Sequence, residues 1–159
     1  MRAVRALVAV AACLMVQQGL ARLWPESVRW IDLLLLPPVA YALMAAPRTA
    51  MIVGCLAGLL QDVWFGSSLF GSNGFRKTLV AFLIGVIGAR LDLNSNHGRF
   101  AAGFAAAMVD AALGLGLREL LGLVPVPAEP LAWTVRAILA GVGVAVAVGW
   151  ASKRRTARR

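Results

Sequence analysis

Long apolar segments alternate with short polar ones along this chain. Each of six apolar segments is near the roughly 20 residues that a helix needs to cross the hydrocarbon core of a bilayer. The expected helices cover residues 3–23, 30–46, 49–65, 77–93, 100–124 and 131–151. The pattern predicts an all-α integral membrane protein, a six-helix transmembrane bundle. Residues 1–151 are expected to form a single six-span domain, followed by a short basic tail over 152–159.

Three of these segments have distinguishing features. Pro37-Pro38 lies in the middle of the second segment, which predicts a kink or break there. In the third, Gly54-x-x-x-Gly58 lets a neighbouring helix approach closely, although this motif is common in membrane helices of every function. The first begins like a secretory signal, but Gln17 and Gln18 interrupt the approach to a cleavage site, so we expect a retained helix.

The connection between the third and fourth segments is long and rich in Gly and Ser. It carries aromatic side chains at the expected depth of the membrane interface, namely Trp64, Phe65, Phe70 and Phe75. Irregular backbone near a bilayer is tolerated only where protein or water satisfies its polar groups. We therefore expect this connection to pack into the bundle.

The composition fits a membrane protein. Hydrophobic residues make up 60% of the chain and charged residues 14%, with a mean hydropathy of +0.79. The net charge of +9 raises nucleic acid as a partner, but no basic face runs along any segment, and the cations follow the topology rule for cytoplasmic loops. No nucleic-acid binding is expected.

The positions of Lys and Arg predict the orientation. With both termini in the cytoplasm, ten cations lie inside and four outside, a clear bias toward the inner side. The inner set is Arg2, Arg5, Arg48, Arg90, Arg99, Lys153, Arg154, Arg155, Arg158 and Arg159, and the outer set is Arg22, Arg29, Arg76 and Lys77. The tail cations could attract anionic lipid headgroups, or they could serve only as a topology anchor.

Several charges lie within or at the ends of apolar segments, where each needs a partner or a function. Most fall at the predicted outer end: Asp32, Asp62, Arg76, Lys77, Arg118, Glu119 and Arg136. They could pair with one another and pin helices together, as Asp62 with Arg76 or Lys77 would. Alternatively, they could line a polar cavity or docking surface that opens to the outer face.

Asp110 is separate from this group. It lies near the centre of the fifth segment, roughly 12 Å deeper than Arg118 at the helical rise. No relay partner is evident, and the role of this intramembrane carboxylate is left open.

No catalytic arrangement is evident. Ser67, Ser68 and Ser72 have no His or Lys base at motif spacing. Cys13 and Cys55 lie within apolar segments without metal-site spacing, and we interpret them as buried small hydrophobes. No enzyme activity, metal or cofactor is expected.

Three blocks of the sequence resemble the MreD family of bacterial rod shape-determining proteins. The most specific is Gly54-x-x-x-Gly58-Leu-Leu-Gln61-Asp62 followed by Gly66-Ser67-Ser68-Leu69-Phe70-Gly71-x-Asn73-Gly74. The others are Ile31-Asp32-Leu-Leu-Leu-Leu-Pro37 and the fourth segment from Lys77 to Arg90. The resemblance is distinctive over residues 31–92 and makes the glycines, Asn73 and the outer charges candidates for structural or partner-docking roles.

This resemblance implies a non-enzymatic component of the cell-elongation machinery in the bacterial inner membrane. Its expected partners are an MreC-like protein and, directly or indirectly, MreB, RodA and its transpeptidase. The family fold looks similar to the substrate-binding subunits of energy-coupling-factor vitamin transporters. The alternative function is therefore such a subunit, with an outward-facing polar pocket and a small-residue face at 101–112 for its coupling protein.

Overall fold

Helices make up the described part of the chain. The computed structural model describes residues 2–66, 69–91, 95–123 and 130–156. Its elements are α1 (Arg2–Leu23), α2 (Ser27–Trp30), the 3-10 turn η1 (Leu33–Leu35), α3 (Leu36–Met44), α4 (Pro47–Phe65), α5 (Ser72–Arg90), α6 (Asn96–Leu120) and α7 (Pro130–Thr156). Each predicted segment is represented by helix, which confirms the all-α membrane class.

The helices differ in whether they can cross a bilayer alone. Three are long and apolar enough: Val4–Leu23, Asn96–Leu120 and Pro130–Lys153. Two more, α4 and α5, have 19 residues each, about 28 Å at the helical rise. By contrast, α3 has only nine residues. The six-span arrangement stays a prediction.

The second predicted segment is divided, but not at the place we expected. A kink was expected at Pro37-Pro38, whereas α3 begins there, with proline in its first turn. Proline is tolerated at this position because the first backbone N–H groups of a helix have no intrahelical partner. The break lies earlier, at Ile31, whose backbone is extended, and at Asp32, whose carboxylate accepts a hydrogen bond from the Leu34 amide.

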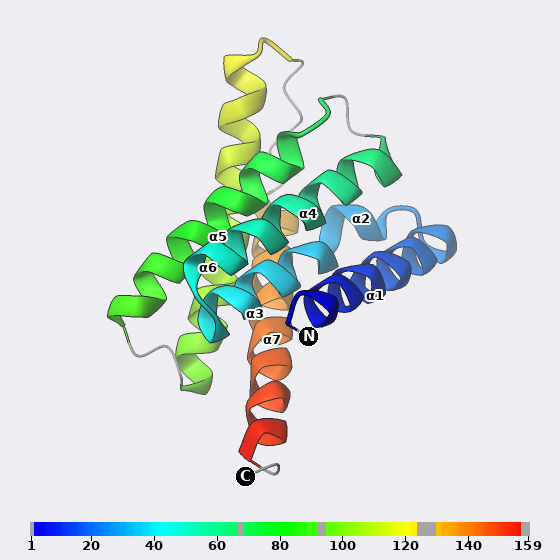
Figure 1. The fold of residues 1–159 in the computed structure, drawn as a ribbon. Helices are drawn as coiled ribbons and strands as arrows, with labels where there is room; N and C mark the ends of the chain where they lie inside the picture. The colour runs from blue at the N-terminus through cyan, green and yellow to red at the C-terminus, as the bar shows by residue number, and fades with distance from the viewer. Residues whose placement is uncertain (1, 67–68, 92–94, 124–129, 157–159) are drawn as a thin grey trace.

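The core lies where α3, α5, α6 and α7 meet, and its side chains are small. It includes Val39 from α3, Val80 from α5, Ala106 from α6 and Ala137 from α7, each fully buried. In Figure 1, α3, α4 and α5 lie side by side and α7 passes behind them. A second, smaller cluster joins α1 to α4 and η1. Small side chains bring the helix axes close together, as is typical of membrane bundles.

The Gly54-x-x-x-Gly58 motif sets the contact between α4 and α5, as predicted. A Cβ atom on Gly54 would stand 2.6 Å from the carbonyl oxygen of Lys77, and one on Gly58 would overlap the carbonyl group of Asn73. Only glycine allows the two backbones to approach this closely. This contact fixes the position of the first two turns of α5 against α4.

The connection between α4 and α5 is shorter than predicted. Helix α4 ends at Gly66 in the left-handed conformation, and Gly71, with a φ of 91°, precedes α5. Because α5 begins at Ser72 rather than Lys77, Arg76 and Lys77 lie in the first two turns of α5 and not in the connection before it. The predicted orientation, with both termini in the cytoplasm, stays a prediction. At the other terminus, α7 continues past Ala151, and the predicted domain boundary there stays a prediction.

Candidate functional site: a buried ion network

Asp32 is the centre of a set of charges buried between helices. Its Oδ2 accepts a hydrogen bond from Lys77 Nζ at 2.5 Å and another from Arg136 Nη2 at 2.6 Å. The Lys77 side chain is completely buried, and that of Asp32 is 2% exposed. A buried charge is costly unless it is paired and hydrogen-bonded, and both conditions are met here.

Asp110 forms the second half of the same network. Arg76 donates two hydrogen bonds to its carboxylate, from Nη2 to Oδ2 at 2.5 Å and from Nε to Oδ1 at 3.2 Å. Arg136 Nη2 lies 3.6 Å from Oδ2 of the same carboxylate. The expectation that Asp110 stands apart from the outer charges is therefore wrong. The Arg76 side chain reaches Asp110 from α5. The expectation considered only the positions of Asp110 and Arg118 along α6, and these positions do not show a contact from another helix.

The five residues connect four segments of the chain. Asp32 precedes η1, Arg76 and Lys77 lie on α5, Asp110 on α6 and Arg136 on α7. Three cations face two carboxylates, so the network carries a formal charge of +1 (3 − 2). Such a network fixes the relative positions of its segments. Moving one segment away would break a buried ion pair and leave a buried charge without a partner, which is costly.

Asp62 has a different role from the one predicted. Its carboxylate accepts hydrogen bonds from the backbone amides of Gly71 (2.9 Å), Asn73 (3.2 Å) and Gly74 (3.4 Å), and from the Asn73 side chain (2.7 Å). The predicted pairing of Asp62 with Arg76 or Lys77 is therefore wrong, since those cations bind the other two carboxylates.

Helix geometry explains why Asp62 binds the start of α5 and why Arg76 and Lys77 bind other carboxylates. Gly71 at the N-cap of α5 has no side chain to bond the free amides of the first turn, and Asp62 supplies that carboxylate from α4. Neighbouring residues on a helix point about 100° apart, since 3.6 residues make one turn. Arg76 and Lys77 consequently reach different segments, α6 and the residue before η1.

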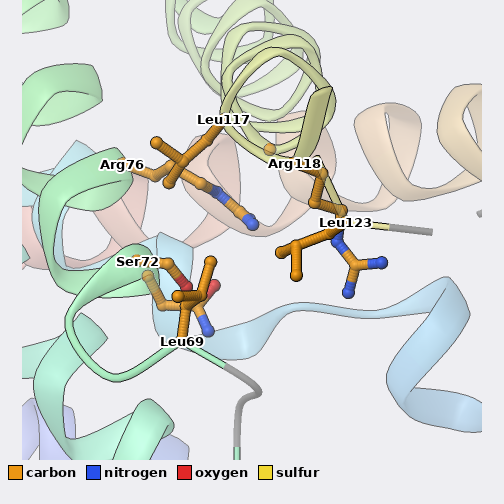
Figure 2. A pocket seen from close by; sticks show the side chains of 8 residues that line it. Leu69, Ser72, Arg76, Leu117, Arg118 and Leu123 are labelled. Carbon is orange, nitrogen blue, oxygen red and sulfur yellow. The ribbon is translucent and has the colours of Figure 1, made fainter. Parts of the chain in front are cut away.

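A cavity of about 100 Å³ adjoins the network at the N-terminal end of α5. Figure 2 shows Arg76 and Arg118 extending from α5 and α6 toward this space, with Leu69, Leu117 and Leu123 around it. The Arg118 side chain has no hydrogen bond or ion pair with any residue that the structure describes. Glu119, its neighbour, is exposed and does not line the cavity.

A family model for rod shape-determining protein MreD matches residues 3–128. The chain belongs to the MreD family. The match confirms the predicted membership and the assignment to a rod shape-determining membrane protein. It includes α1 to α6, whereas Arg136 and the rest of α7 lie beyond it.

No curated protein and no solved structure matches this MreD-family chain. The likeness to vitamin-transporter subunits is therefore unconfirmed. No group of three or more His, Cys, Asp or Glu side chains within the described ranges is placed to hold a metal ion.

Most of the candidate residues of this MreD-family chain thus lie in two adjoining sites. Asp32, Arg76, Lys77 and Arg136 meet in the network, together with Asp110. The turn held by Asp62 and the first residues of α5 contain Gly66, Gly71, Asn73 and Gly74. Arg118 lines the cavity beside the network, and Glu119 is exposed outside both sites.

One supporting residue was not predicted. Gln17 of α1 is 2% exposed, and its Oε1 accepts a hydrogen bond from the Leu33 amide at 3.0 Å. This bond ties α1 to the segment that carries Asp32. The only signal in the sequence was an amide side chain within an apolar segment.

Proposed function

We propose that this protein is a non-enzymatic component of the cell-elongation machinery that supports rod shape and peptidoglycan synthesis by binding an MreC-like protein. MreB, RodA and its transpeptidase would join the same assembly directly or indirectly. The observation that carries the proposal is the family match over residues 3–128. The protein would lie in the bacterial inner membrane, with both termini in the cytoplasm.

The structure suggests how such a protein could act as a scaffold. The ion network holds four segments in fixed relative positions next to the α4–α5 turn. On the same turn and its flanks, Trp64, Phe70 and Phe75 are 52%, 73% and 57% exposed. Exposed aromatic side chains on a rigid support favour protein contacts at a membrane interface. We place the MreC-like partner on this surface, the aromatic turn.

Two observations favour this function over a vitamin-binding subunit. Ala102, Ala106 and Ala107, on the small-residue face considered for a coupling protein, are buried in the core. The cavity of about 100 Å³ is also below the roughly 300–1,000 Å³ typical of small-molecule pockets.

Affinity capture from native membranes tests the proposal. The tagged protein should recover an MreC-like protein, and the double variant Phe70→Ala, Phe75→Ala should recover much less. Phe82→Ala is the matched control, because Phe82 is also an exposed phenylalanine of the α5 region, at 41%, but lies away from the turn. Recovery of a coupling protein with two ATPases, and no MreC-like protein, would instead support the transporter function.

A further inference from the structure

The cavity between α5 and α6 is lined by charged, polar and apolar side chains. Arg76 and Arg118 contribute the charges, while Leu69, Leu117 and Leu123 contribute the apolar surface. Both arginines line this cavity, and in Figure 2 Leu123 lies between their guanidinium groups. A volume of about 100 Å³ holds several waters, given roughly 10–15 Å³ of such volume for one, and is therefore large enough for a phosphate group.

Both arginines have donors available to a ligand. Arg76 uses Nε and Nη2 for Asp110, while its Nη1 has no hydrogen-bond partner within the described ranges. This Nη1 lies 2.8 Å from the point where a Cβ of Gly114 would stand. Gly114 lines the cavity, so the absence of a side chain there leaves Nη1 accessible. Arg118 has all its donors free within the same ranges.

The charge balance favours an anion. The adjoining network already carries +1, and Asp62 is occupied by the first turn of α5. Arg118 adds a further positive charge without a compensating carboxylate in the lining. Arginine is suited to phosphate because its planar guanidinium donates two parallel hydrogen bonds to two oxygens.

We propose that this cavity binds the phosphate group of an anionic phospholipid through Arg76 and Arg118. Lipid fits better than free phosphate, because the three leucines in the lining can contact the glycerol and the first acyl methylenes. The surroundings are also apolar and accessible, since Phe70 and Leu121 beside the lining are 73% and 52% exposed. The site adjoins the aromatic turn at Phe70, and it can be tested on the purified protein without the MreC-like partner.

Thermal unfolding of the purified protein in a neutral detergent tests the site. Three probes are titrated: dioctanoyl phosphatidylglycerol, dioctanoylglycerol and inorganic phosphate. A ligand that binds only the folded state raises the midpoint in a saturable way. We expect such a rise with the phospholipid and none with dioctanoylglycerol. An equal saturable rise with inorganic phosphate would identify free phosphate as the ligand and overturn the lipid assignment.

Variants locate the effect. Arg118→Gln should raise the half-maximal phospholipid concentration about tenfold or more, the size of one lost charge-assisted hydrogen bond. Leu117→Phe fills the cavity without changing its charge and should also weaken binding, which covers the case that Arg118→Gln does not fold. Arg90→Gln is the matched control, because Arg90 is an exposed arginine at the opposite end of α5. Unchanged phospholipid binding in both cavity variants, or an equal loss in the control, would overturn the proposal.

Discussion

Replacing Asp32 by Asn tests whether the ion network stabilises the fold. The substitution keeps the shape of the side chain and removes its charge. The Asp32 carboxylate holds both Lys77 and Arg136, but the two cations have different alternatives. Arg136 is 20% exposed and has Asp110 within 3.6 Å, whereas Lys77 is completely buried and has no second carboxylate within the described ranges. Most of the cost should therefore arise from Lys77.

Stranding one member of a buried ion pair costs about 3–5 kcal/mol. We expect the lower end, about 3 kcal/mol, because Arg136 keeps a partner, and this lowers the unfolding midpoint by roughly 6–12 °C for a chain of this length. Adding Lys77→Met to Asp32→Asn should restore most of the loss, since it removes the stranded charge. Thermal unfolding in detergent, followed by tryptophan fluorescence, measures all three proteins.

Glu119→Gln is the matched control for Asp32→Asn. It also removes one negative charge, but from an exposed side chain, so its effect should stay within about 0.5 kcal/mol. Equal midpoints for the two variants would refute the reasoning. A double variant that is less stable than Asp32→Asn would do so as well, because it would mean that Lys77 is not stranded by the loss of Asp32.

Three further predictions address the α4–α5 contact and the topology. Asp62→Ala should destabilise the isolated protein by roughly 2–3 kcal/mol in the same unfolding assay, because it exposes the first turn of α5 without a capping acceptor; an unchanged midpoint would contradict the capping role. Gly58→Ala should cost about 1–3 kcal/mol through overlap with the Asn73 backbone. Gly19→Ala, where nothing lies within 4 Å, should be neutral or slightly stabilising, and similar losses at both glycines would contradict the close approach. A green fluorescent reporter fused after Arg159 should fluoresce in the cytoplasm, whereas activity of a periplasmic phosphatase at the same site would contradict the predicted orientation.

The helices themselves could be predicted from the sequence because long apolar segments leave little alternative in a bilayer. The close approach at Gly54 and Gly58 was predicted for the same kind of reason, since it depends on a local motif. The start of α5 could not be predicted, because its cap comes from Asp62, nine residues before the N-cap Gly71. A local search for capping residues finds Ser72 and Asn73 beside Gly71, but not the carboxylate that accepts from the first turn.

Which cation pairs with which carboxylate could not be predicted from the sequence either, for a different reason. Arg76 and Lys77 are adjacent in the chain, yet they bind Asp110 and Asp32 on different segments. Which carboxylate each one meets depends on how α5 is rotated about its axis, and packing sets that rotation. The depth of Asp110 was estimated from its position along α6 alone. That estimate does not include the long side chain of Arg76, which spans the distance from α5 to Asp110.

The central claim, a rod shape-determining function, is tested most directly by depletion in the native bacterium. Cells that lose this protein should change from rods to rounded cells, as measured by the ratio of cell length to width, and a plasmid copy should restore the rods. Cells that remain rod-shaped after complete depletion, with normal peptidoglycan incorporation along the sidewall, would contradict the account.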